Sequence, residues 1–126
     1  MPNPLKILIV EDNQDTRELL HYYFTNAGYS VPTAIDGQEG LYMAKTEKPD
    51  LIISDVSMPN MNGIEMVRQI RSDAEIAHTP IIVFTALNSS TEEKLSEAGA
   101  NRVFHKPFDF DELQKIVRGL LGQPDS

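Results

Sequence analysis

The sequence predicts an α/β fold, a doubly wound sheet of five parallel strands with helices on both faces. Short apolar runs alternate with helix-like segments along the whole chain, which is the pattern of βα units. Two of the runs, 51–54 and 80–84, are almost continuously apolar, as expected for central strands that are covered on both faces. A weaker run contains Pro32, which cannot donate to a strand ladder and therefore places that run at an edge.

The first half of the chain contains two of these units. The apolar run Leu5–Val10 predicts the first strand, and apolar residues at helical spacing predict a helix over Gln14–Asn26. The weaker edge strand is expected over Tyr29–Ile35. Asp36 with Glu39 three residues later is typical of a helix N-cap and predicts the start of the second helix.

The second half contains three further units. The third strand is predicted over Leu51–Ser54 and is followed by a short helix with apolar residues at helical spacing. The fourth strand, Pro80–Phe84, is followed by a helix with few apolar residues, which we expect to be loosely packed. The fifth strand is predicted over Arg102–His105, and a last helix from Asp109 carries a regular apolar stripe.

A strand order of 2-1-3-4-5 with right-handed crossovers closes such a sheet and leaves the proline-containing strand at an edge. In sheets of this kind the functional site lies beyond the carboxyl ends of the strands, where the winding reverses. Here those ends carry reactive or charged side chains, namely Glu11, Asp12, Asp55, Thr85 and Lys106. The sequence therefore predicts three carboxylates, a hydroxyl and an ammonium group on one rim.

The bulk composition excludes several classes of function. The 126 residues include no cysteine, so disulfides and thiolate metal sites are excluded, in agreement with a reducing cytosol. The net charge of −8 argues against direct DNA binding, which needs a basic surface. The first apolar run is too short for a signal peptide or a membrane span. We expect one domain over residues 1–122, a disordered tail over 123–126 and no output domain.

Three carboxylates on one rim repel each other, so we expect either raised pKa values or a bound cation there. Oxygen ligands without cysteine or clustered histidine favour a hard ion, Mg²⁺ before Ca²⁺ or Mn²⁺. A carboxylate beside such an ion, here Asp55, can act as a nucleophile and form an aspartyl phosphate. Thr85 can donate a hydrogen bond to a phosphoryl oxygen, and Lys106 can neutralise another.

The chain resembles the response regulator receiver domains of two-component signalling over nearly its whole length, and four segments resemble the motifs of that family in order and in spacing. The chain is close to the stand-alone chemotaxis type. The segments are ILIVEDN (7–13), DLIISDVSMPNMNG (50–63), PIIVFTA (80–86) and HKPF (105–108). The resemblance implies a cytoplasmic protein that takes a phosphoryl group from a sensor histidine kinase or a histidine phosphotransfer protein.

The resemblance also implies a role for each site residue. Asp55 would be the phosphoacceptor, and Thr85 and Lys106 would bind the phosphoryl group. Phosphorylation would switch a surface of helix 4, strand 5 and helix 5 toward a downstream protein target, without contact to DNA or membrane. The peptide bond between Lys106 and Pro107 would be cis.

The same resemblance implies how Mg²⁺ would be held. Asp12, Asp55 and the main-chain carbonyl of Ser57 would bind the ion, and Glu11 would act through water. Ser57 and Leu87 flank the site and would influence the lifetime of the phosphorylated state.

The chain departs from the family at one position. Three residues before Lys106 the family usually has an aromatic residue whose rotamer reports phosphorylation, and here that residue is Val103. Phe104 is one residue further on and on a strand points to the opposite face. The usual aromatic movement is therefore not expected here.

Three other functions are compatible with a fold of this kind. A flavodoxin-like cofactor module has the same topology, but the acidic stretch EDNQD (11–15) would repel a phosphate. An aspartate-nucleophile phosphatase would need an acid two residues after Asp55, where Ser57 stands. A receiver that acts as a phosphorylation-independent adaptor would not need the complete acid, threonine and lysine set. We therefore expect a signalling protein that assists its own phosphorylation and dephosphorylation and is not otherwise an enzyme.

Overall fold

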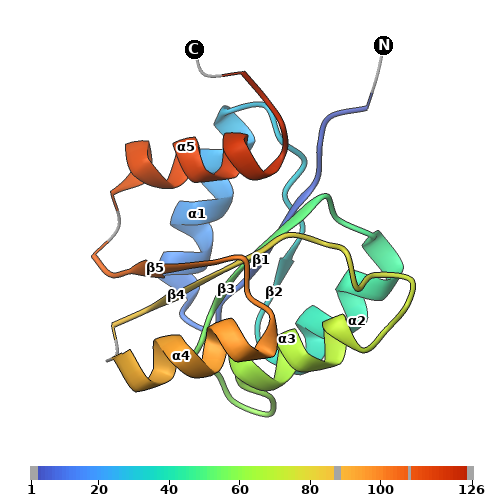
Figure 1. Ribbon diagram of the computed structural model, residues 1–126. Helices are drawn as coiled ribbons and strands as arrows, with labels where there is room; N and C mark the ends of the chain where they lie inside the picture. Colours follow the sequence, from blue (N-terminus) through green and yellow to red (C-terminus); the bar gives the residue numbers. More distant parts are fainter. Residues whose placement is uncertain (1–2, 87–88, 108, 125–126) are drawn as a thin grey trace.

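The structure is a computed structural model that describes residues 3–86, 89–107 and 109–124. Strands and helices alternate along this part of the chain (Figure 1). Their bounds are β1 (Ile7–Val10), α1 (Gln14–Asn26), β2 (Thr33–Ala34), α2 (Gly37–Glu47), β3 (Leu51–Asp55), α3 (Gly63–Arg71), β4 (Ile81–Thr85), α4 (Ser89–Ala98), β5 (Arg102–His105) and α5 (Phe110–Leu120).

The strands form one parallel sheet in the order β2-β1-β3-β4-β5, as the sequence predicts. Their register brings the carboxyl ends level with each other. Val10 pairs with Ser54, and in the next two ladders Asp55 pairs with Phe84 and Thr85 with His105. The residues that follow β1, β3, β4 and β5 therefore emerge at one edge of the sheet.

Helices cover both faces of the sheet (Figure 1). Alternate strand residues point to opposite faces and divide the core into two clusters. One cluster joins the sheet to α1 and α5 and includes Phe24, Phe84 and Val117. The other joins it to α2, α3 and α4 and includes Met66 and Leu95. Both faces are thus buried, which explains why the central strands are continuously apolar.

The edge strand is shorter than the sequence predicts. Of the expected strand Tyr29–Ile35, the structure pairs Thr33–Ala34 with β1, and Ser30 forms an isolated bridge with Lys6. Pro32 lies between these two points and contributes its carbonyl oxygen, which accepts from the Ile9 amide at 3.0 Å. A proline can accept but not donate in a ladder, so the pairing is interrupted there.

The other elements agree with the prediction to within a few residues. The side chain of Asp36 caps α2 by accepting from the Glu39 amide at 2.8 Å. Asp109 caps α5 in the same way. Among the described side chains of α4, Leu95 and Ala98 are the buried ones, in line with its apolar-poor sequence.

Val103 and Phe104 face opposite sides of the sheet, as predicted. Val103 packs against the cluster beneath α4, and Phe104 belongs to the cluster beneath α1 and α5. The peptide bond between Lys106 and Pro107 is cis. In the described residues, no helix has the length and apolar character needed to cross a bilayer.

Some sequence expectations fall at the ends of the described segments. Leu87, Phe108 and the last two residues of the expected tail lie outside the described residues. Gln123, where that tail was expected to begin, accepts a hydrogen bond from the Tyr29 hydroxyl at 2.5 Å.

Candidate functional site

The end of β1 supplies two carboxylates with different surroundings. Glu11 is 1% exposed, and its amide donates to the carbonyl of Ala34 at 3.0 Å. Asp12, the next residue, is exposed. Asn13 then caps α1 by accepting from an amide of its first turn. The chain therefore turns from strand to helix at this point. It places the Glu11 side chain in the buried part of the site and the Asp12 side chain on the exposed part.

Asp55 is the last residue of β3 and is 6% exposed. Its Oδ1 accepts a hydrogen bond from the Val56 amide at 2.7 Å, and its Oδ2 lies 3.4 Å from the Lys106 Nζ. Gly63, the first residue of α3, packs directly on the end of β3. A Cβ at Gly63 would come within 2.7 Å of the Asp55 carbonyl oxygen, so glycine allows α3 to begin this close to the strand.

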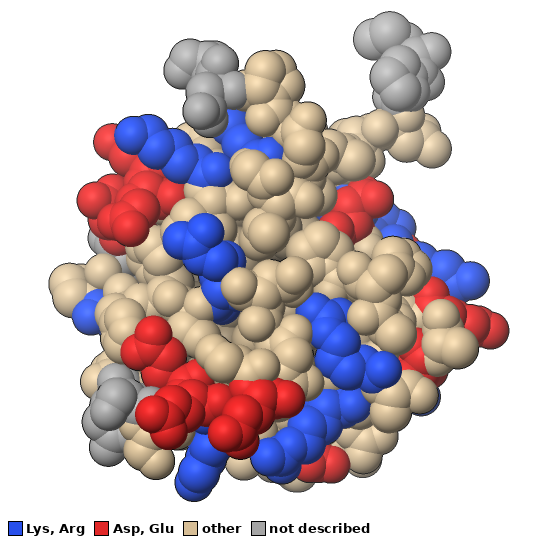
Figure 2. All heavy atoms as spheres, in the orientation of Figure 1, with Lys and Arg blue, Asp and Glu red and all other residues tan. Residues whose placement is uncertain are grey.

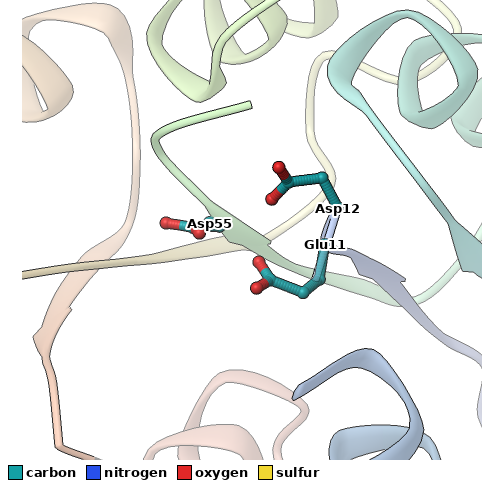
Figure 3. Close-up of side chains that lie close together, drawn as sticks. All are labelled: Glu11, Asp12 and Asp55. Carbon is teal, nitrogen blue, oxygen red and sulfur yellow. The ribbon is translucent and has the colours of Figure 1, made fainter. Parts of the chain in front are cut away.

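The three carboxylates meet at the edge of the sheet. Figure 3 shows Glu11 and Asp12 at the end of β1 and Asp55 at the end of the neighbouring β3, with their carboxyl groups close together. One oxygen from each lies within 4.8 Å of the others. The sequence-predicted cluster of acidic groups is therefore present.

The surroundings of Glu11 in this cluster raise the pKa of its carboxyl group. Burial and a hydrogen bond with the Asp55 carboxyl raise the pKa of Glu11 from 4.5 to about 8. Among the described residues, Glu11 Oε2 is the buried side-chain atom that has no hydrogen-bond partner. Without a cation, Glu11 thus keeps its proton at neutral pH, because burial disfavours its charged form and the neighbouring Asp55 carboxylate repels it.

These residues fit a hard divalent cation. The donors are all oxygen atoms, and Glu11 Oε2 is a buried acceptor that a cation or its water shell would satisfy. The acidic cluster can therefore hold a metal ion such as Mg²⁺.

A hydroxyl and an ammonium group border the acidic cluster. Thr85 ends β4 and is fully buried. Lys106 follows β5, and its amide donates to the Thr85 carbonyl at 3.1 Å. Its Nζ lies beside Asp55 and 5.6 Å from the centre of the Phe84 ring. Ser57 comes two residues after Asp55, and its amide lies 3.4 Å from Asp55 Oδ1.

Asn60 is a residue near the site that the sequence reasoning missed. Its Nδ2 donates to Asp36 Oδ2 at 2.7 Å and so joins the segment after β3 to the start of α2. The sequence identified Asp36 as a helix cap and nothing more. No local pattern indicates this pairing, because the two residues are 24 positions apart.

Comparison with known proteins agrees with this geometry. The family model for the response regulator receiver domain matches residues 7–118. Response regulator MprA of Mycolicibacterium vanbaalenii is 40% identical over 119 residues, which are 94% of this chain and 51% of that protein. The chain thus spans about half the length of the curated relatives it matches.

Solved structures show the same architecture over nearly the whole chain. The chemotaxis response regulator CheY4 of Vibrio cholerae superposes with a TM-score of 0.87 at 34% identity, covering 94% of this chain and 99% of that one. Response regulator TrrA of Thermotoga maritima, solved in complex with Mg²⁺ and BeF, has a TM-score of 0.82 at 34% identity and covers 92% and 98%. Because the family model matches residues 7–118 and the solved structures share the fold, this chain belongs to the response regulator receiver domain family.

Proposed function

We propose that Asp55 accepts a phosphoryl group from a phosphohistidine on a sensor histidine kinase or a histidine phosphotransfer protein. The observation that carries this proposal is the position of Asp55. Its carboxylate lies at a strand end between two further carboxylates and the Lys106 ammonium group. A site built for stability alone would not place three carboxylates within 4.8 Å of one another.

The chemistry follows from the groups that surround Asp55. A carboxylate oxygen of Asp55 attacks the phosphorus atom, the bond between phosphorus and the imidazole nitrogen breaks, and an aspartyl phosphate results. Lys106 neutralises a phosphoryl oxygen, and the Thr85 hydroxyl donates to another. Attack by water on the phosphorus later releases inorganic phosphate and restores the carboxylate.

The proposal includes Mg²⁺ as the cofactor. Asp12, Asp55 and the main-chain carbonyl of Ser57 would hold the ion, and Glu11 would act through a bound water. When bound, Mg²⁺ neutralises charge on the transferring phosphoryl group. The buried Glu11 Oε2 supports this assignment, because a cation or its water shell would supply the partner that this atom lacks.

The output of the switch would be a change at the surface of α4, β5 and α5, read by a downstream protein. The chain would act as a signalling module that assists only its own phosphorylation and dephosphorylation. We place it in the cytoplasm, with no direct contact to DNA or membrane. The lack of cysteine and the net charge of −8 support these assignments.

Acetyl phosphate with Mg²⁺ tests the central step. We expect intact-mass analysis to show one added phosphoryl group that is labile to hydroxylamine, as an acyl phosphate is. Asp55→Asn keeps the shape of the side chain but removes the nucleophile, so this variant should stay unlabelled. Asp50→Asn, one residue before the same strand, is the matched control and should be labelled like the wild type.

Two results would contradict the proposal. Labelling of Asp55→Asn at another residue would show that a different carboxylate is the acceptor. A wild-type protein that binds Mg²⁺ but is never labelled would favour the phosphorylation-independent adaptor instead.

A further inference from the structure

The segment between β3 and α3 carries Ser57, whose carbonyl belongs to the proposed metal site. The middle of this segment, residues 58–61, has few hydrogen bonds to other described residues. In the described part of the chain, residues 58–61 are joined to another element by one hydrogen bond, from Asn60 Nδ2 to Asp36 Oδ2 at 2.7 Å. Met58 and Met61 add packing against the core cluster beneath α2 and α3.

Asn60 has an unusual backbone conformation. It has a positive φ of 67°, and the Met61 amide donates across it to the Pro59 carbonyl at 2.7 Å. A three-residue turn with a positive central φ is rare and strained. Strain of this kind persists where the surroundings hold it in place, and it is concentrated near functional sites.

The side chain of Asp36 bonds to this turn and to the start of α2 at the same time. Its side chain is largely buried, and its two oxygens have separate partners. Oδ1 accepts from the Glu39 amide at 2.8 Å and caps α2, which leaves Oδ2 for Asn60. These hydrogen bonds lower the pKa of Asp36, so the carboxylate stays ionised and a strong acceptor at neutral pH.

The backbones on either side of this hydrogen bond are in close contact. Gly37 follows Asp36, and a Cβ at Gly37 would lie 2.0 Å from the Met61 carbonyl oxygen. No side chain fits in that space, so the start of α2 and the turn at Asn60 pack backbone against backbone. The hydrogen bond and this contact together fix the turn against a helix that is anchored in the core.

We propose that Asp36 and Asn60 are positioning residues, which hold the segment from Ser57 to Met61 in the conformation that the metal site requires. This inference rests on the proposed function and extends it to a pair of residues that contact neither the metal nor the phosphoryl group. Groups that hydrogen-bond directly to metal ligands typically change metal affinity 10- to 100-fold when they are removed, and this pair acts one step further out, through the backbone that carries Ser57. The affinity for Mg²⁺ should therefore depend on the Asn60–Asp36 hydrogen bond.

An exchange of the two side chains gives a sharp test. Asn60→Asp alone places two carboxylates against each other, and they repel. In the double variant Asp36→Asn/Asn60→Asp the donor and acceptor are exchanged and the hydrogen bond can form again. Asparagine is also a good N-cap, so the double variant keeps the cap of α2.

Two single glycine variants separate the effect of the hydrogen bond from the effect of the backbone conformation. Asn60→Gly removes the side chain, and glycine adopts positive φ without strain. Lys48→Gly makes the same kind of change at the other end of α2, where Lys48 has a φ of 48°. Lys48 contributes a long surface ion pair with Glu75, at 3.9 Å, and is the matched control.

The first measurement is the Mg²⁺ dissociation constant by titration calorimetry. We expect Asn60→Asp and Asn60→Gly to weaken Mg²⁺ binding about tenfold, and we expect the double variant to regain most of it. Lys48→Gly should bind as the wild type does. Labelling by acetyl phosphate should fall at low Mg²⁺ in the two single variants and recover at high Mg²⁺.

The second measurement is amide hydrogen exchange without metal. Exchange in residues 57–61 should be faster in Asn60→Gly and unchanged there in Lys48→Gly. The inference is wrong if Asn60→Gly matches the wild type in both measurements, or if the double variant binds Mg²⁺ as weakly as Asn60→Asp. A wild type that binds no Mg²⁺ would instead overturn the proposed function itself, so the two failures are distinguishable.

Discussion

Glu11 has a buried carboxyl group beside that of Asp55, and this arrangement determines the pH at which Glu11 loses its proton. Its pKa is raised from 4.5 to about 8, first by burial and then by its hydrogen bond with Asp55. Between these two pH values the folded protein keeps a proton that the unfolded chain releases. The folded state therefore loses stability as pH rises through this range. Each pKa unit corresponds to about 1.4 kcal/mol, so the loss reaches a few kcal/mol.

Glu11→Gln should remove this pH dependence. We expect the metal-free variant to be more stable than the wild type at pH 8 and to lose less stability between pH 5 and pH 8. Urea unfolding in the presence of a chelator measures both. The exposed Glu18 offers a control, since Glu18→Gln should keep the wild-type slope. An equal slope in Glu11→Gln would show that Glu11 is not the group responsible.

At the scale of the element, α4 is the part best suited to change its position. Its described side chains bury only Leu95 and Ala98, and acidic side chains gather over it in Figure 2. An element that buries little can have two arrangements that differ by a few kcal/mol, as a switch requires. Val103, on the strand beneath it, has no aromatic ring, so a rotamer change of an aromatic side chain cannot serve as the switch at this position.

The two ends of α4 are not equally free to move. The Arg71 guanidinium group donates to the Gly99 carbonyl at 2.9 Å, to the Thr79 carbonyl at 2.7 Å and to Asn101 Oδ1 at 2.8 Å. Burial lowers the pKa of Arg71. The segment that follows α4 is thus tied to α3 and to the start of β4, so any movement should be larger toward the beginning of the helix.

Hydrogen exchange with and without beryllofluoride, a phosphoryl mimic, tests this element. Protection should change between Thr85 and His105, most strongly in the first half of α4. It should hardly change in the edge strand region 29–35. The Asp55→Asn variant serves as the control, because the mimic should not bind it. A response limited to the segment after Asp55 would contradict this model of the switch.

At the scale of the whole molecule, Mg²⁺ should stabilise the fold. A ligand that binds only the folded state adds about 2.7 kcal/mol at a concentration of 100 times its Kd, which raises the melting temperature by several degrees for a domain of this size. The effect includes relief of repulsion within the acidic cluster, in a chain whose net charge is −8.

The variant Asp12→Ala separates the stabilising effect of Mg²⁺ from the effect of removing a negative charge. This variant should lose the Mg²⁺ effect and be more stable than the wild type without metal, because one of the three clustered carboxylates is gone. Asp15→Ala removes an exposed charge in the first turn of α1, outside the cluster, and should keep the Mg²⁺ effect. Melting curves with and without millimolar Mg²⁺ decide this, and a wild type indifferent to Mg²⁺ would contradict the shared site.

Much of this molecule could be predicted from the order of its residues. The alternation of apolar runs and helical segments predicted the sheet, and Pro32 predicted which strand lies at its edge. Because parallel strands end at one edge, the predicted topology also places five residues on one rim, namely Glu11, Asp12, Asp55, Thr85 and Lys106. These features depend on local periodicity and chain direction, which a sequence contains.

Other features were decided by the tertiary structure alone. Glu11 and Asp12 are adjacent acidic residues, yet one is buried with a raised pKa and the other is exposed. Asn60 meets Asp36 across 24 residues, and Arg71 ties together segments that no motif connects. Burial and long-range hydrogen bonds depend on how helices pack against the sheet. Local sequence patterns do not predict that packing.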